Sequence, residues 1–309
     1  MSPAPATLPE AAEAREAAPA APRPTRPLYW SVRRELWENR SIHLAPLGVA
    51  AFTVAALVTH GVTMPSHMPG VLANDPANPG SALVTYRVAA MLMLATLFVT
   101  AAFYCTDALS GERRDRSILF WKSLPVSDRT TVLAKAIVPL AVLPMVTFAA
   151  IVAIHLALLL LSAVALLAQG FGVAPLWRAL HLFQTWGTLL YALAAMALWH
   201  APIYGFLLLV SGWARRTAGL WAVLPLLALG VIEKLTMDTT RVAALVAHAL
   251  IGWYGAAFAP AAREHIPFEP STALTPGRFL MTPWLWIGLG LAVVFVAAAV
   301  RLRRYRAPG

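Results

Sequence analysis

Six long apolar runs constrain the fold of this chain more than any other feature. A helix needs about 20 apolar residues to cross a hydrocarbon core of about 30 Å, because each residue adds about 1.5 Å. Six stretches meet this length, at about 44–62, 84–106, 136–168, 182–213, 217–236 and 284–301. We therefore predict an all-α integral membrane protein with six transmembrane helices.

The composition agrees with this prediction. Charged residues make up 12% of the chain, hydrophobic residues 59%, and the mean hydropathy is +0.68. Soluble domains carry about 25% charged residues, roughly twice as many. Cys105 is the single cysteine of the sequence, so an intrachain disulfide and a thiolate metal cluster are both excluded. We expect no metal and no cofactor.

The third and fourth runs are longer than a membrane crossing requires. The run at 136–168 has 33 residues, and a straight helix of that length would extend about 50 Å. Pro139 and Pro144 are predicted to kink it and to leave its first turns at the cytosolic interface. The fourth run contains Pro202.

Basic residues concentrate on one side of the predicted topology, as they do in cytosolic loops. With six alternating spans, eighteen of the twenty-four Lys and Arg residues lie on one side: six before residue 41, six in 113–135, Arg215 and Arg216, and four in 301–306. Both termini are therefore predicted to be cytosolic. The same asymmetry accounts for the net charge of +10 without a nucleic-acid partner, which we do not expect.

Three segments outside the spans are assigned separately: a tail, an amphipathic helix and an outer loop. Residues 1–27 are rich in Ala and Pro and are predicted to form a disordered cytosolic tail. Residues 28–41 mix aromatic and Arg side chains just before the first span, which predicts an amphipathic helix in the interface. The connection at 237–283 is expected to be an outer loop. Its first part, 239–258, has a helical pattern and is interfacial, re-entrant or lumenal.

Polar side chains within the spans are few. Because they are costly in lipid, such residues often mark a transport path. His155, Gln184 and His200 are therefore candidates for a translocation path. A neighbouring helix can equally satisfy a buried His, so both interpretations stay open. No phosphate-binding glycine loop and no grouping of acid, base and nucleophile predicts an enzyme.

The segment between the second and third spans, 110-SGERRDRSILFWKSLPVSDRTTVLAK-135, is the most informative polar stretch. It holds six basic residues and three carboxylates around a short apolar run. Glu112 and Arg116 stand at i and i+4 in the favourable order for a helical pair. Two apolar ridges follow: Ile118 with Trp121, and Phe120 with Leu124.

Two residues divide this segment. Pro125 ends the first helix, because the residue before a proline resists the helical conformation. Ser127 is a good cap for the helix that resumes at about Arg129. A loop that is merely solvated would not need four consecutive apolar residues. The pattern therefore favours a partner protein or a packing surface.

This stretch resembles the first cytosolic loop of the ABC-2 type transporter permeases. The residues that match are Glu112, Arg113, Ser117, Leu124, Pro125, Val126, Ser127, Leu133 and Lys135. Arg116 replaces the glycine that is usual in the family, which suggests a more regular helix. The stretch 199-WHAPIYGFLLLVSGWARRT-217 also resembles the fourth span of the family and the basic turn after it. The resemblance covers about residues 28–306 and implies that 28–309 form one six-span permease domain.

The resemblance also implies a mechanism. Such permeases dimerise, with a copy of themselves or with a related permease, and dock two cytosolic ABC ATPase subunits. The helix at about Glu112–Leu124 would be the coupling helix, lying in a groove of the ATPase. Its implied contact residues are Glu112, Arg113, Arg116, Ile118, Phe120, Trp121, Leu124 and Pro125. ATP hydrolysis then belongs to the partner chain, which agrees with the missing nucleotide motif.

Together these features predict an exporter subunit that passes several times through a bacterial inner membrane. The alternative is a polytopic scaffold or a lipid-modifying membrane enzyme that has no ATPase partner. The sequence does not identify a transported substrate, and it leaves homodimer and heterodimer equally open.

Overall fold

The structure is a computed structural model that describes residues 26–63, 81–114, 126–168, 170, 172–174, 181–214, 217–259 and 274–305, with 57, 60–63, 81–87 and 165 described through the backbone alone. Its elements are α2 (Pro27–Glu38), α3 (Ser41–Thr63), α5 (Ser81–Asp107), α6 (Ser110–Arg114), α8 (Asp128–Ile137), η2 (Val138–Val142), α9 (Leu143–Ala168), α11 (Leu182–Trp213), α12 (Ala218–Met237), α13 (Arg241–Ala257), α14 (Pro276–Leu280) and α15 (Pro283–Tyr305). An isolated β-bridge pairs Phe258 with Leu274. Within these residues the predicted all-α class is confirmed.

Five helical stretches are long and apolar enough to cross a membrane: Val88–Arg114, Asp128–Ala168, Leu182–Trp213, Ala218–Met237 and Pro283–Tyr305. They coincide with five of the six predicted spans. By length and composition the chain is therefore a multi-pass membrane protein. The first predicted span lies in α3, a helix of 23 residues. Its crossing of a membrane stays a prediction.

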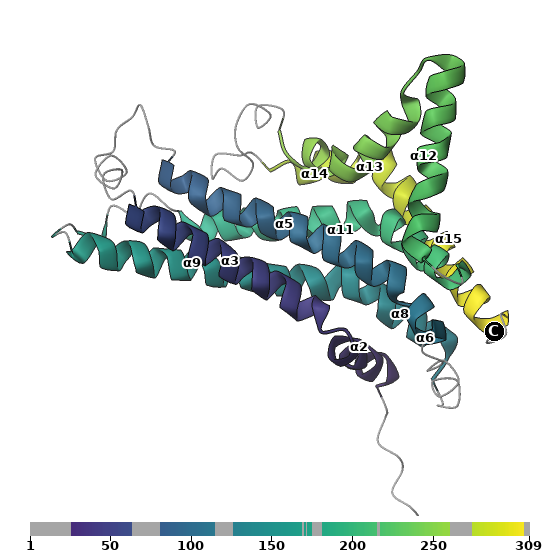
Figure 1. Ribbon diagram of the computed structural model, residues 1–309, viewed down its shortest axis with the longest axis horizontal. Coiled ribbons are helices and arrows are strands. Elements are labelled where there is room, and N and C mark those ends of the chain that lie inside the picture. Colours follow the sequence, from purple (N-terminus) through teal and green to yellow (C-terminus); the bar gives the residue numbers. More distant parts are fainter. Residues whose placement is uncertain are drawn as a thin grey trace, which may run out of the picture.

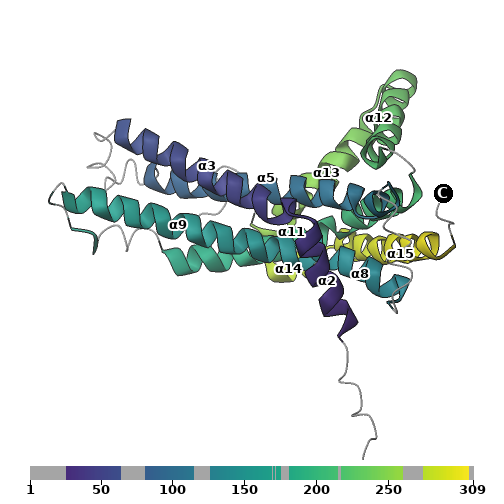
Figure 2. The ribbon, with the colours of Figure 1, turned by 60° about the horizontal axis from the view of Figure 1, so that its bottom comes forward.

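The long helices form an elongated bundle. Figures 1 and 2 show α3, α5, α9 and α11 running side by side, with α2 at one end. Helix α11 packs against α15, α5, α12, α13 and α9, so it is the central element of the fold. Helices α12 and α13 project from the bundle as a hairpin (Figure 1). The predicted outer loop thus contains two helices, α13 and α14.

A π turn interrupts the long helix that begins at Asp128. Helices α8 and α9 are continuous through η2, which contains Pro139. Proline lacks the amide hydrogen of a regular helix, and a wider turn accommodates its ring. The irregularity predicted at this proline is therefore present, and it separates the polar helix α8 from the apolar helix α9.

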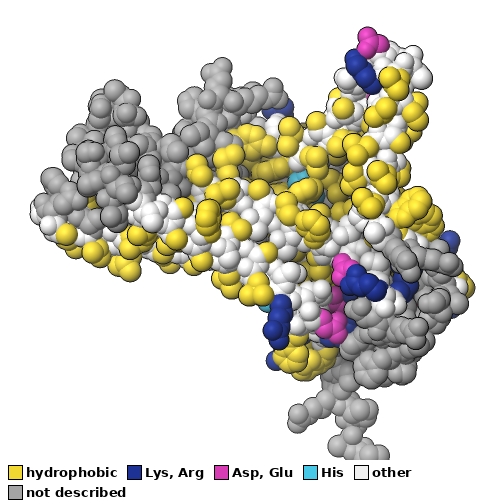
Figure 3. All heavy atoms as spheres, in the orientation of Figure 1, with side chains coloured by type: hydrophobic (Ala, Val, Ile, Leu, Met, Phe, Trp, Pro, Cys, Tyr) yellow, Lys and Arg dark blue, Asp and Glu magenta, His cyan; other side chains and the backbone are white. Residues whose placement is uncertain are grey.

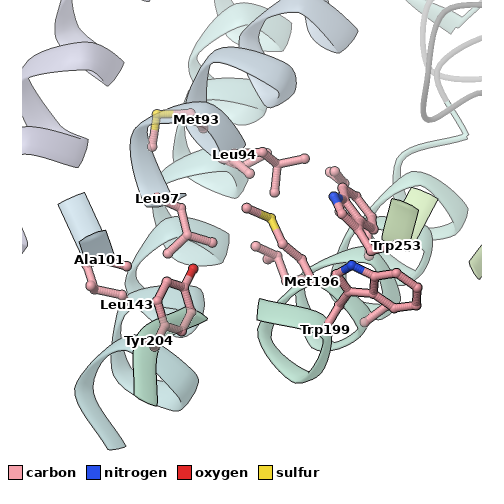
Figure 4. Close-up of a cluster of buried hydrophobic side chains, with 14 of the residues drawn as sticks. Met93, Leu94, Leu97, Ala101, Leu143, Met196, Trp199, Tyr204 and Trp253 are labelled. Atoms are coloured by element: carbon pink, nitrogen blue, oxygen red, sulfur yellow. The ribbon is translucent and has the colours of Figure 1, made fainter. Parts of the chain in front are cut away.

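Side chains from several helices fill the centre of the bundle. Met93, Leu94 and Leu97 of α5 face Met196 and Trp199 of α11 (Figure 4). All five are buried. Lipid tails are as apolar as this core, so the hydrophobic effect does not drive the helices together within a membrane. Close van der Waals packing of these side chains stabilises the bundle instead.

The surface separates apolar and charged regions. Hydrophobic side chains cover most of the described surface in Figure 3, while charged ones gather near α2 and α6 and at the tip of the α12–α13 hairpin. Along α12 most apolar side chains are exposed, including Leu227 at 59%. A helix that is apolar on its exposed faces suits contact with lipid rather than water.

Helices α11 and α15 approach closely through small residues. A Cβ added at Gly205 would lie 3.2 Å from the carbonyl oxygen of Ala292, and one at Gly288 would lie 3.3 Å from Cγ of Pro202. Gly288 and Ala292 are spaced by four residues on α15, so they lie on one face. Small residues at this spacing let helix backbones pack tightly in a membrane.

This packing makes a prediction for Gly205. Gly205→Val should force the two helices apart and lower the free energy of unfolding by about 1–3 kcal/mol, the usual effect of overpacking. Thermal unfolding of the purified protein in detergent measures the change as a lower Tm. Gly290→Val is the matched control, because a Cβ at Gly290 has no neighbour within 4 Å. Equal Tm values for the two variants would contradict the close contact.

Candidate functional site

Six charged side chains meet where α2, α6, α8 and α15 come together. We name them the charge cluster: Arg34 and Glu35 of α2, Glu112 of α6, Asp128 and Lys135 of α8, and Arg303 of α15. Three are cations and three are carboxylates, so the charges balance. Four of them, Glu35, Glu112, Lys135 and Arg303, are each less than 9% exposed.

Lys135 lies between the two buried carboxylates. Its Nζ is 2.8 Å from Oε1 of Glu35 and 3.1 Å from Oε1 of Glu112. Arg34 approaches the same two oxygens through Nη2, at 3.0 Å from Glu35 and 3.1 Å from Glu112. Two cations therefore hold two carboxylates of like charge close together.

Arg303 joins the C-terminal helix to both ends of the segment between the second and third predicted spans. Its Nη1 contacts Oε2 of Glu112, and its Nε donates a hydrogen bond of 3.0 Å to Oδ1 of Asp128. Glu112 precedes residues 115–125 and Asp128 follows them. A single guanidinium thus fixes the two ends of this segment relative to α15.

Neutral groups donate further hydrogen bonds to Glu35. The hydroxyl of Tyr104 donates to Oε2 of Glu35 over 2.8 Å, and Nδ2 of Asn39 donates to the backbone oxygen of Glu35 over 3.1 Å. Both carboxylate oxygens of Glu35 therefore have partners. At the edge of the cluster, burial raises the pKa of Glu38 above its ordinary value, against the opposing effect of Arg34.

The energetic consequence is a strong mutual dependence. Moving one charged group from water into a protein interior costs several kcal/mol, and its partners offset this only with good geometry. Removing one member leaves an uncompensated buried charge, which typically costs about 3–5 kcal/mol. The four helices are therefore held in one arrangement in which all the charges are paired.

Helix α6 has a second anchor on α11. Oγ of Ser211 accepts hydrogen bonds of 3.0 Å from the backbone nitrogens of Leu109 and Ser110. The guanidinium of Arg113 donates to the carbonyl oxygens of Ser211 and Ala214, the latter at 2.8 Å. The start of the segment is thus held by the last turn of α11 as well as by the charge cluster.

The other end of the segment is capped as predicted. Oγ of Ser127 accepts a hydrogen bond of 3.1 Å from the backbone nitrogen of Thr130, and α8 begins at Asp128. This contact satisfies a backbone donor that has no partner within the helix. Residues 115–125 are therefore bracketed by two fixed helix ends.

A cavity of about 750 Å³ lies beside the charge cluster, at the junction of α3, α5, α6 and α12. Phe103 and Leu220 contribute apolar walls, and Ser41 and Arg114 contribute polar ones. Tyr104 lines the cavity and also donates its hydroxyl hydrogen to Glu35. One side chain therefore joins the cavity to the cluster.

Of the residues predicted to couple to an ATPase, the structure describes two. Glu112 lies in the charge cluster and Arg113 on the end of α11. The other predicted residues, Arg116, Ile118, Phe120, Trp121, Leu124 and Pro125, lie outside the described residues. The predicted Glu112–Arg116 pair lies outside them too, and the coupling helix stays a prediction.

The three polar candidates for a translocation path do not form one site. Nδ1 of His155 accepts a hydrogen bond of 3.2 Å from Trp186, and Nε2 of His200 lies 2.9 Å from the carbonyl oxygen of Leu250. Trp186 and His200 are 14 residues apart on α11, or about 21 Å along its axis. Gln184 is exposed on the same helix. Each His thus has a hydrogen-bond partner on a neighbouring helix, and its part in a translocation path stays a prediction.

Sequence reasoning did not identify Glu35, Tyr104, Lys135 or Arg303 as site residues. In the sequence, Arg303 stands only among the cytosolic positive charges, whereas Lys135 is one of these charges and also a residue of the motif resemblance. A usable signal is present for Lys135, which directly precedes the longest apolar run. Such isolated charges at the edge of apolar segments require a partner.

Comparison of the chain with protein-family models, with curated proteins and with solved structures finds no match.

The charge cluster predicts that one substitution at Lys135 strongly destabilises the protein. Lys135→Met should lower the free energy of unfolding by about 3–5 kcal/mol, because Glu35 and Glu112 stay buried with one cation fewer. Unfolding in mixed detergent, followed by circular dichroism, measures it. The matched control is Lys234→Met, which removes an exposed pair with Asp238 and should change stability by less than about 1 kcal/mol. Similar losses in both variants would show that the cluster contributes no more than a surface pair.

Proposed function

We propose that this chain is the membrane-spanning permease subunit of an ATP-binding cassette exporter. It acts together with a second permease subunit and with separate cytosolic ATPase subunits that hydrolyse ATP. The observation that carries the proposal is the bracketing of residues 115–125 by Glu112 and Asp128, both paired with Arg303. The motif resemblance in the same segment adds independent support.

The geometry around this segment suits the transmission of movement. A force applied to residues 115–125 reaches α6 and α8 at the two ends of the segment. From there, ion pairs lead to α15 through Arg303 and to α2 through Glu35. Buried pairs of this kind resist separation, so the connected helices move together or adopt a second discrete arrangement.

A transport cycle follows from these connections. ATP binding closes the ATPase subunits, and the segment carries this movement into α8, which continues through the π turn into α9. A π turn is a local irregularity of the kind often found at functional sites. ATP shifts the equilibrium toward the closed state of the ATPase subunits, because it binds that state more tightly than the open one.

The test is co-purification with an ATPase. Tagged wild-type chain, expressed in its own cells, should retain a cytosolic ATPase with a phosphate-binding loop. Phe120→Glu or Trp121→Glu should reduce the retained ATPase by at least about tenfold, since a buried unpaired charge at a contact of this kind costs 2 kcal/mol or more. Quantitative mass spectrometry of the purified membrane fraction measures the ratio of the two chains.

Ser123→Glu serves as the control, because it changes the charge by the same single unit at a polar position of the same segment. It should leave most of the ATPase bound, and all variants should insert into the membrane in equal amounts. Wild-type protein that never retains an ATPase refutes the proposal. In that case a polytopic scaffold or a lipid-modifying membrane enzyme becomes the better account.

A further inference from the structure

Helix α2 has two faces with different environments. Pro27 stands in its first turn, where a missing amide hydrogen costs nothing, and the backbone nitrogen of Asn39 bonds back to Glu35 at its end. Glu35 points into the charge cluster and is 1% exposed. The opposite face carries aromatic residues that point away from the bundle.

Three residues on this outward face form an ordered set. Trp30, Arg33 and Trp37 are spaced at i, i+3 and i+7, so they share one face of the helix. The Trp30 side chain is 57% exposed and that of Trp37 is 69% exposed. The guanidinium carbon of Arg33 lies 5.3 Å from the ring centroid of Trp30 and 4.9 Å from that of Trp37. We name these three residues the Trp–Arg–Trp ladder.

The ladder fixes a cation that lacks a carboxylate partner in the described part of the chain. The Glu side chains of α2 are engaged elsewhere: Glu35 pairs with Lys135, and Glu38 pairs with Arg34 at 3.4 Å. The guanidinium carbon of Arg33 lies over both indole rings, and the N–H donors that do not face a ring can bind an anion. Arg33 itself is half-buried, whereas Arg26 and Arg40, beyond the two ends of α2, are exposed. This face is therefore basic as well as aromatic.

We infer that the Trp–Arg–Trp ladder binds the phosphate of an anionic phospholipid headgroup. The guanidinium edge of Arg33 donates paired hydrogen bonds to phosphate oxygens, a geometry that a planar fork matches well. The two indole rings lie at headgroup depth, where Trp is enriched because it is apolar with one polar N–H. The surplus positive charge then favours an anionic lipid over a zwitterionic one.

The position of the ladder supports a lipid as its ligand. Helix α2 leads within three residues into α3, which runs along the apolar bundle (Figure 2). Basic and hydrophobic side chains both reach the surface around α2 (Figure 3). A site for soluble phosphate does not require two exposed tryptophans beside the membrane-facing bundle. This inference rests on the multi-pass architecture and does not depend on an ATPase partner.

The experiment is a lipid titration of the full chain in neutral detergent, followed by native mass spectrometry. Phosphatidylglycerol and phosphatidylcholine with identical acyl chains are the two probes. Wild-type protein should bind phosphatidylglycerol at least about fivefold more tightly, the preference expected from one well-placed Arg. Inorganic phosphate at millimolar concentration is added as a competitor and should not displace the lipid. Equal affinity for the two lipids, or displacement by phosphate, would overturn the inference.

Three variants assign the preference to the ladder. Arg33→Gln should lose most of the fivefold preference, and Arg33→Lys should retain more than half of it because the charge remains. Arg301→Gln removes an exposed cation at the end of α15 and should leave the preference unchanged. Circular dichroism checks that each variant is folded, which the outward position of Arg33 leads us to expect. If Arg33→Gln keeps the preference, or Arg301→Gln loses as much, the ladder is not the binding site.

Discussion

Burial of charge at one end of the helical bundle is the constraint on which the arrangement depends. Glu35, Glu112, Lys135 and Arg303 are shielded from solvent, and none of them is tolerable there alone. Their pairing brings together α2, α6, α8 and α15, which are far apart in the sequence. Lipid tails are as apolar as the helices, so helix association in a membrane depends on specific contacts, here the close packing of α11 with α15 and these ion pairs. The charge cluster supplies that specificity at its end of the bundle.

The same cluster gives α2 a role beyond that of an entry helix. Its inner face contributes Glu35 to the ion pairs, while its outer face presents the Trp–Arg–Trp ladder. In our account, lipid bound on one face and nucleotide-driven movement on the other act on a single helix of 12 residues. The two proposals remain separable, because Arg33 and Glu35 point in opposite directions and can be changed independently.

Much of the fold could be predicted from the sequence, because apolar length and helix caps are local properties. The bounds of α11 match the predicted 182–213, and the cap at Ser127 is as expected. The charge cluster could not be predicted in the same way. Arg303 and Glu112 are 191 residues apart, and their meeting depends on how α11 and α15 pack. Local pairing rules instead suggested Arg116 as the partner of Glu112, and that residue lies outside the described segments.

Hydrogen exchange of the assembled complex tests the central claim most directly. The proposed complex of permease and ATPase is compared with and without trapped nucleotide, and deuterium uptake is followed in α6, α8 and the last turns of α15. Because Arg303 joins these three helices, the account predicts that uptake changes in all of them together. A nucleotide-dependent change confined to residues 115–125, with the end of α15 unaffected, would contradict it.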